Sequence, residues 1–154
     1  MFKPFSLQPL MNLAQHQNES ATRELGQRNR QQQSMQEKLE MLQKYRSDYQ
    51  ARLQAASQSG MDPAALRNFQ EFINKLDEAI AQQRLSVEQS KVSVQAGRSE
   101  FDTTQRKLKS YSTLQERHVE EQKKVDARSE QRAQDEHTGR FTALRIQNAE
   151  DKSH

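Results

Sequence analysis

The chain has 154 residues, a net charge of +3, no cysteine and no tryptophan, and only 32% of it is hydrophobic. A globular core normally draws on nearly half apolar residues, so this composition excludes a large globular core. The small net charge, three prolines and four glycines argue equally against a disordered chain. Because residues that favour helices (Gln, Glu, Lys, Arg, Ala and Leu) dominate the sequence, we predict an elongated helical protein that buries one narrow apolar stripe.

The first predicted helical arm covers about residues 6–56, with Ser6 able to cap it and Pro9 inside the first turn, where proline is tolerated. Alternating steps of four and three residues along this arm land mostly on apolar side chains. An apolar repeat of 3.5 residues held over this span is typical of a left-handed coiled coil. The positions of this first seam are Leu7, Met11, Ala14, Asn18, Ala21, Leu25, Arg28, Gln32, Met35, Leu39, Leu42, Arg46, Tyr49, Leu53 and Ala56.

The strongest interruption inside the chain is the segment 57–62, which we predict to be a loop. Gly60 can adopt the left-handed conformation that closes a helix. Asp62 is a good N-cap, and Pro63 then takes the first helical position, where its missing N–H costs nothing. Because a short loop joins the two helices, we expect them to be antiparallel neighbours.

The second predicted arm covers about residues 63–136 and repeats the same spacing. We therefore predict an all-α fold, a long two-helix antiparallel coiled-coil hairpin that forms a single domain over residues 1–154. At 1.5 Å per residue, the paired part should extend over about 75 Å. The second seam consists of Leu66, Phe69, Ile73, Leu76, Ile80, Gln83, Val87, Ser90, Val94, Gly97, Phe101, Thr104, Leu108 and Tyr111.

The residues after Leu114 form an overhang, because the first arm is too short to pair with them. We expect helix up to about Glu136, interruption at Gly139, and a frayed, partly helical tail over residues 137–154 that orders on a partner. The unpaired stripe of the overhang also makes weak self-association plausible. Its apolar residues are Leu114, Val119, Val125, Phe141, Leu144 and Ile146.

Polar residues interrupt both seams, and two interpretations of them remain open. Polar seam residues usually set the register of a coiled coil at some cost in stability. Alternatively they make the hairpin flexible, and Gly97 is then the best candidate for a soft point, at roughly 1 kcal/mol against alanine. The polar positions are Asn18, Arg28, Gln32 and Arg46 in the first seam, and Gln83, Ser90, Gly97 and Thr104 in the second.

No pattern in the sequence indicates catalysis, so we predict a protein that is not an enzyme and uses no cofactor or metal. The four histidines, His16, His118, His137 and His154, are scattered without ligand spacing. The acidic pairs 120–121 and 135–136 are typical of a solvated helix face, and a coiled coil offers no pocket to shift their pKa values. Interleaved charges argue against nucleic-acid binding, and no apolar run approaches the roughly 20 residues that a membrane span needs.

A few apolar side chains lie outside the seam, on one flank of each arm. Tyr45 in the first arm, with Phe72 and Ala79 in the second, occupies the heptad position that usually carries Glu or Lys. In an antiparallel pair these flanks lie on the same side, near the loop. The side chains could broaden the seam where the helices diverge, or they could form an exposed aromatic patch for a partner protein. They lie beside Leu42, Tyr49 and Leu76 of the seams.

Several blocks of this sequence together carry a family resemblance. Leu39–Tyr49 has leucines at 39 and 42 and tyrosines at 45 and 49. This block is similar to the L-x-x-L-x-x-Y-x-x-E/D-Y signature of the FliJ family of flagellar export proteins. Asn68–Ile80 followed by Gln83 resembles its second-helix block. The opening 5–10, with the blocks 113–117 and 130–136, extends the resemblance over nearly the whole chain. The chain departs from the family pattern at Gln83, a position that can be histidine there, and at Lys38, which can be glutamine.

The resemblance implies a non-catalytic cytoplasmic component of the flagellar type III export apparatus, peripheral at the inner face of the cell membrane and not inserted into it. Such rods resemble the stalk of a rotary ATPase. They enter the ring of the export ATPase (FliI), promote its assembly, and contact the membrane export gate protein (FlhA) and possibly export chaperones. Carried over to this sequence, the gate-binding patch would comprise Leu42, Tyr45, Tyr49, Phe72, Leu76, Ala79 and Gln83.

The ATPase contact is expected at the other end of the hairpin, where exposed cations could meet several equivalent loops of a ring. A solvated helix face remains the alternative interpretation of these residues. Two other functions also remain open, namely the stalk protein of a virulence type III secretion system and a structural or cargo-chaperone coiled coil without an ATPase partner. The predicted tip residues are Arg117, Lys123, Lys124, Arg128 and Arg132.

Overall fold

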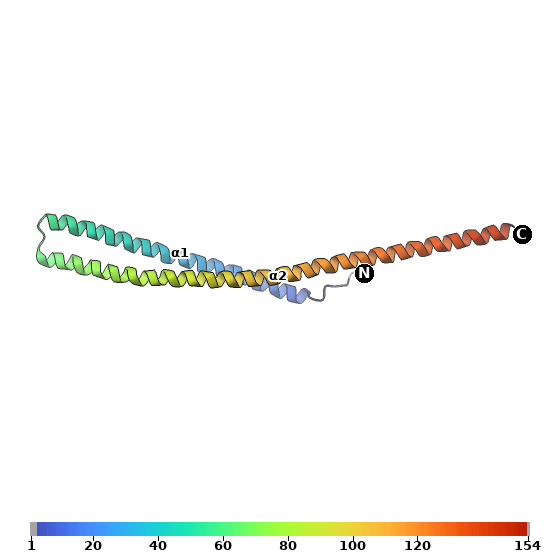
Figure 1. Ribbon diagram of the computed structural model, residues 1–154, viewed down its shortest axis with the longest axis horizontal. Coiled ribbons are helices and arrows are strands. Elements are labelled where there is room, and N and C mark those ends of the chain that lie inside the picture. Colours follow the sequence, from blue (N-terminus) through green and yellow to red (C-terminus); the bar gives the residue numbers. More distant parts are fainter. Residues whose placement is uncertain (1–2, 154) are drawn as a thin grey trace. The chain divides into compact units, whose positions relative to one another are not determined.

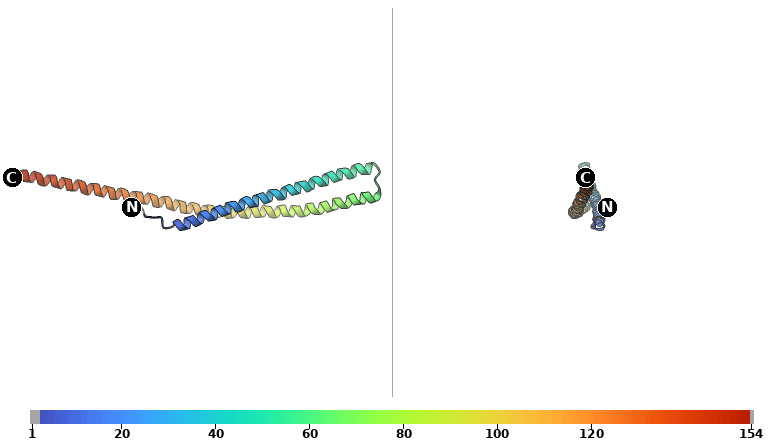
Figure 2. Two further views of the ribbon diagram at one scale, coloured as in Figure 1. Left: turned by 180° about the vertical axis from the view of Figure 1, so that it is seen from behind. Right: turned by 90° about the vertical axis from the view of Figure 1, so that its right-hand side faces the viewer.

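The computed structural model describes residues 3–153 and contains two long helices, α1 (Gln8–Gln58) and α2 (Pro63–Lys152). The chain divides into two compact units, one formed by residues 15–106 and the other by residues 1–14 and 107–154. In the unit of residues 15–106, α1 and α2 lie side by side and are joined by the loop at residues 59–62 (Figures 1 and 2). The predicted all-α helical hairpin is therefore confirmed.

The loop has the chemistry that its sequence predicts. Gly60 has a φ of 80°, in the left-handed region that favours glycine. The backbone N–H of Ser59 donates to the carbonyl oxygen of Ala55 at 3.2 Å and completes the last turn of α1. Asp62 lies at the N-cap, since its carbonyl oxygen accepts the first hydrogen bond of α2 from Leu66 N–H at 3.0 Å. Pro63 follows as the first helical residue.

The core of the hairpin is the predicted pair of seams. Leu39, Ile80 and Val87 form a buried cluster, against which Met35 and Leu42 pack. Every other predicted seam position of residues 15–106 is buried or half-buried, with the exception of Leu66 near the loop. Ile73 is the most deeply buried of the large apolar side chains in the core. The 3.5-residue repeat thus identified the interface between the helices.

Polar seam residues link the two helices by hydrogen bonds. The amide of Asn18 donates to Thr104 Oγ1 at 3.1 Å, and the amide of Gln83 donates to the carbonyl oxygen of Met35 at 2.8 Å. Among the described residues, every buried side-chain nitrogen or oxygen has a hydrogen-bond partner. Because a shift of register would leave these buried groups unpaired, the contacts favour the register-setting interpretation over deliberate flexibility.

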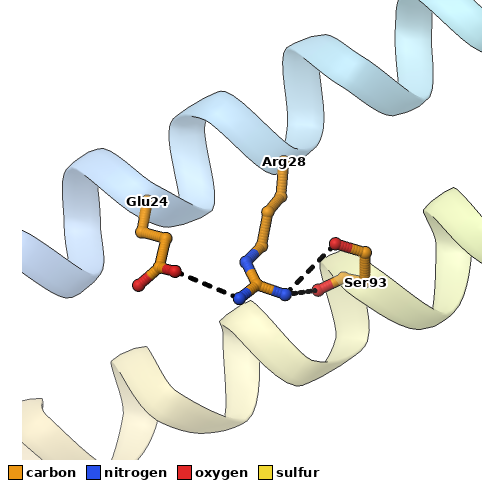
Figure 3. Close-up of polar contacts among 3 residues, drawn as sticks. All are labelled: Glu24, Arg28 and Ser93. Carbon is orange, nitrogen blue, oxygen red and sulfur yellow. Dashed lines mark hydrogen bonds and ion pairs between the residues drawn. The ribbon is translucent and has the colours of Figure 1, made fainter.

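Arg28 makes a third cross-helix link. Its Nη1 donates to the carbonyl oxygen of Ser93 at 3.0 Å and to Ser93 Oγ at 3.1 Å, while its Nη2 donates to Glu24 Oε1 at 3.1 Å (Figure 3). The guanidinium reaches the α2 backbone because Gly97 lies opposite. A Cβ at Gly97 would come within 2.8 Å of Arg28 Cδ, and of Leu25 Cδ1 at 3.4 Å. Gly97 is therefore a site of close approach between the two helices.

The close approach at Gly97 predicts an unusual result for glycine-to-alanine substitution. We expect Gly97→Ala alone to give no stabilisation, because the steric conflict with Arg28 offsets the gain in helix propensity. In an Arg28→Ala background the same substitution should stabilise the hairpin by about 1 kcal/mol. Gly26→Ala is the matched control, since its Cβ would meet Arg30 Nη1 at an ordinary 3.6 Å. Urea denaturation followed by circular dichroism measures all four variants; equal stabilisation by Gly97→Ala and Gly26→Ala would contradict the argument.

The second helix is longer than the sequence pattern predicts. We predicted an interruption at Gly139 and a partly helical tail from residue 137, whereas α2 continues to Lys152. A single glycine costs about 1 kcal/mol in a helix interior, and the helix-favouring residues around Gly139 outweigh that cost. His154 lies outside the described residues.

Candidate binding surfaces

An aromatic cluster lies between the helices near the loop. The ring of Tyr49 on α1 packs against Phe72 on α2 with centroids 4.4 Å apart, and against Phe69 with centroids 6.1 Å apart. The guanidinium of Arg52 lies 5.5 Å from the Tyr49 ring centroid. Tilted ring pairs and a cation over a ring face are favourable geometries. Phe69 and Arg52 therefore belong to this surface, although the sequence interpretation left both outside the patch; the i, i+3 spacings to Phe72 and Tyr49 were the available signal.

The predicted gate-binding residues divide into exposed and buried side chains. Tyr45 and Phe72 are 49% and 40% exposed, and both are therefore available to a partner. Ala79 on the same flank of α2 is half-buried, as are Leu42 and Tyr49 at the seam. The structure thus gives this surface an exposed aromatic part and a half-buried apolar border.

Leu76 and Gln83 are the buried members of the predicted patch. Leu76 is part of the core, and Gln83 is only 6% exposed. The Gln83 amide also lies 3.5 Å from the sulfur of Met35, in addition to its hydrogen bond to the Met35 carbonyl oxygen. Both side chains therefore pack inside the hairpin, where a partner protein could not contact them directly.

One ion pair lies beside the aromatic cluster. Arg46 of α1 donates from Nε to Asp77 Oδ1, and from Nη2 to Asp77 Oδ2 at 3.5 Å. The hydrogen bond to Asp77 and, after it, the negative charge of Asp77 raise the pKa of Arg46 further above its usual range. Because both groups are partly exposed, the pair contributes little to stability.

The predicted tip residues all lie on α2 beyond the hairpin unit, and all are exposed. Arg117, Lys124 and Arg128 are spaced by seven and four residues, which places them on one helix face. Arg132 continues that face, whereas Lys123 lies about a third of a turn away from it. Four of the five predicted cations therefore share one helix face, and the acidic Glu121 lies on the same face.

Within the unit of residues 1–14 and 107–154, the start of the chain up to Gln8 contacts α2. A ring nitrogen of His118 donates to the carbonyl oxygen of Lys3 at 2.8 Å, and the ring packs against Phe5 with centroids 5.6 Å apart. The Gln115 amide donates to Gln8 Oε1 at 3.1 Å. Sequence reasoning assigned His118 no role, because its partners come from the far end of the chain. The apolar residues predicted for the overhang are all exposed on α2, namely Leu114, Val119, Val125, Phe141, Leu144 and Ile146.

Within residues 3–153, no group of three His, Cys, Asp or Glu side chains could hold a metal ion. Neither helix contains, over the described residues, a stretch apolar and long enough to cross a membrane. The geometry instead offers surfaces, an aromatic one near the loop and a basic one on the distal part of α2. These features define a class of helical coiled-coil proteins that expose aromatic and basic side chains along their helices.

Comparison with known proteins specifies the class further. The family model "Flagellar FliJ protein" matches residues 2–145. Flagellar FliJ proteins of Salmonella typhi and Escherichia coli (strain K12) are each 30% identical over 131 residues, covering 85% of this chain and 89% of the relative. The chain belongs to the FliJ family of flagellar proteins.

A solved structure shares the fold. The YscO homologue from Chlamydia trachomatis superposes with a TM-score of 0.68, covering 95% of this chain and 99% of that one, at 17% sequence identity. At this identity the likeness concerns the helical architecture alone.

Proposed function

We propose that this protein is a non-catalytic component of a bacterial flagellar export apparatus that binds an export ATPase ring (FliI) and a membrane export gate (FlhA). The observation that carries the proposal is the family match over residues 2–145, in a chain that exposes two chemically different surfaces. The protein would act in the cytoplasm, peripheral to the membrane through its partners. Promotion of ring assembly would follow if one copy contacted several ATPase subunits.

The aromatic surface is the proposed contact with the gate. Aromatic side chains dominate interface energies because they bury a large area at a low cost in conformational entropy. Tyr45 and Phe72 supply exposed rings, while Tyr49, packed on Phe72, holds the border in place. Since the rings are carried on paired helices and not on a loop, a partner would meet a preorganised surface.

The basic face of distal α2 is the proposed contact with the ATPase. Arg117, Lys124, Arg128 and Arg132 lie on one side of the helix, exposed to solvent. Long cationic side chains can form shallow contacts with several equivalent acidic loops in turn, and such contacts depend strongly on salt. Lys123 would contribute only at the edge of this face.

A pull-down of the tagged full-length protein from lysate of its own bacterium tests the proposal. We expect mass spectrometry to identify a flagellar export ATPase and the export gate protein. Increasing salt should release the ATPase before the gate, because its contact is the charged one. Recovery of neither protein would remove the proposed function and leave an unassigned helical adaptor.

A second candidate function is the stalk of a virulence type III secretion system. The YscO homologue shares the helical architecture, and this likeness of fold does not distinguish the two candidates. In the same pull-down, recovery of a virulence-system ATPase without the flagellar one would select this candidate. A structural or cargo-chaperone coiled coil would bring down neither ATPase.

A further inference from the structure

The outward side of α2 carries a second row of residues with coiled-coil spacing. The row starts at Ala81 and advances by alternating steps of four and three residues, on the side of the helix opposite to the buried Ile80, Val87 and Gly97. In Figures 1 and 2, α1 runs along one side only of this stretch of α2. The outer row comprises Ala81, Leu85, Glu88, Val92, Gln95 and Ser99, all exposed.

Leu85 and Val92 are the most exposed large apolar side chains of the described residues, at 65% and 70%. They lie seven residues apart at the same outward heptad position, so that one partner helix could cover both. The α1 interface does not need either of them, because it is complete without this side of α2. Isolated apolar residues on a surface need no explanation, whereas two in heptad register form the start of a seam.

A basic row borders the outer row along one edge. Arg84, Lys91 and Arg98 follow one another at intervals of seven residues and are exposed. Lys91 bonds to Glu88 of its own helix at 3.3 Å, whereas Arg84 and Arg98 form no ion pair within residues 3–153. The other edge of the outer row is uncharged, with Gln82, Gln89 and Ala96.

The other helix of the hairpin, α1, does not neutralise the basic row. On the flank of α1 that faces this edge of α2, the heptad positions hold Thr22, Asn29 and Gln36, which are uncharged. A helix that covered the outer row would place its own flanking residues against the basic row, as the e and g positions do in a coiled coil. Acidic residues at those flanking positions would therefore complete the interface.

We propose that the outer row over residues 81–99 is a docking site for an amphipathic helix of another protein, with apolar residues at alternating three- and four-residue spacing and an acidic edge. A second copy of this chain fits poorly. In an antiparallel dimer, the basic row of one copy would lie against the basic row of the other. In a parallel dimer, the basic row of one copy would lie against the uncharged edge of the other. The proposal concerns neither the aromatic surface nor the distal basic face, so it does not depend on the gate or the ATPase.

Fluorescence anisotropy of two labelled helical peptides tests the proposal on the full-length protein. Both probes carry leucines at the required spacing over about three heptads; one has glutamate along one edge and its twin has lysine there. We expect the acidic probe to bind and the basic probe to bind at least about tenfold more weakly, with the difference shrinking as salt rises. Equal binding of the two probes, or binding of neither, would overturn the proposal.

Paired variants locate the site. The double variant Leu85→Gln with Val92→Gln should weaken binding of the acidic probe at least about tenfold, since both apolar contacts are lost. Leu144→Gln replaces an exposed leucine elsewhere on α2 and should leave binding unchanged. Because these side chains are exposed, circular dichroism should show all variants folded. A loss of binding with Leu144→Gln equal to that of the double variant would refute the location.

A pair of charge-reversal variants tests whether the basic row, and not the net charge of the protein, causes the preference for the acidic probe. Arg84→Glu with Arg98→Glu should abolish the preference for the acidic probe. The same double charge reversal on α1, Arg23→Glu with Arg30→Glu, should keep it. Analytical ultracentrifugation decides on self-association. A dimer of the wild type that disappears with Leu85→Gln and Val92→Gln would identify a second copy as the occupant and overturn the proposal.

Discussion

Joint replacement of Tyr45 and Phe72 by alanine is expected to abolish binding to the export gate and swimming motility, while the protein stays folded. The expectation rests on the proposed function and on the exposure of both rings. Alanine favours helix more than either aromatic residue does, so helicity should be maintained. Removal of Phe72 also removes its contact with Tyr49, which should cost about 1 kcal/mol of stability and leave the hairpin intact.

Complementation of a strain that lacks the gene, with gate binding measured on the purified protein, provides the test. Met41→Ala is the matched control, because Met41 is as exposed as Tyr45, lies one turn away, and is outside the proposed surface. If the double variant unfolds, the two rings belong to the interior interface and the surface is not a binding site. If it folds and supports normal swimming, the gate contact lies elsewhere.

Ile73→Ala should destabilise the hairpin more than truncation of any exposed side chain, because it removes most of the largest fully buried side chain. Ile73 is 2% exposed, between the helices and close to the loop. Truncation of a buried isoleucine to alanine costs about 2–5 kcal/mol. Since two paired helices can close partly over a cavity, we expect about 2–3 kcal/mol in this hairpin.

Thermal and urea unfolding, followed by circular dichroism, measure the effect. Leu85→Ala is the control, because Leu85 is exposed and its truncation should change the free energy of unfolding by less than about 0.5 kcal/mol. A similar decrease in the free energy of unfolding for both variants would mean that burial of Ile73 between the helices contributes no more to stability than an exposed side chain does. Helical content before unfolding should be the same in both proteins.

The sequence alone was sufficient for the hairpin and its interface. A 3.5-residue repeat is a local property of each helix, and it identified nearly all the side chains that the structure buries, from Ala21 to Thr104. The loop was equally predictable, because Gly60 and Pro63 restrict the backbone through their own geometry. Heptad position also placed Tyr45 and Phe72 on the flank of the seam, where both rings are partly exposed and Phe72 packs on Tyr49.

Only the tertiary structure decided which side chains of the predicted gate surface are accessible and what the polar seam residues do. The burial of Gln83 against Met35, and the passage of Arg28 over Gly97 to Ser93, depend on the register between two segments far apart in sequence. A repeat fixes the face of each helix but not which residue lies opposite which. That choice follows from pairing particular buried groups across the interface, where an unpaired donor or acceptor is costly.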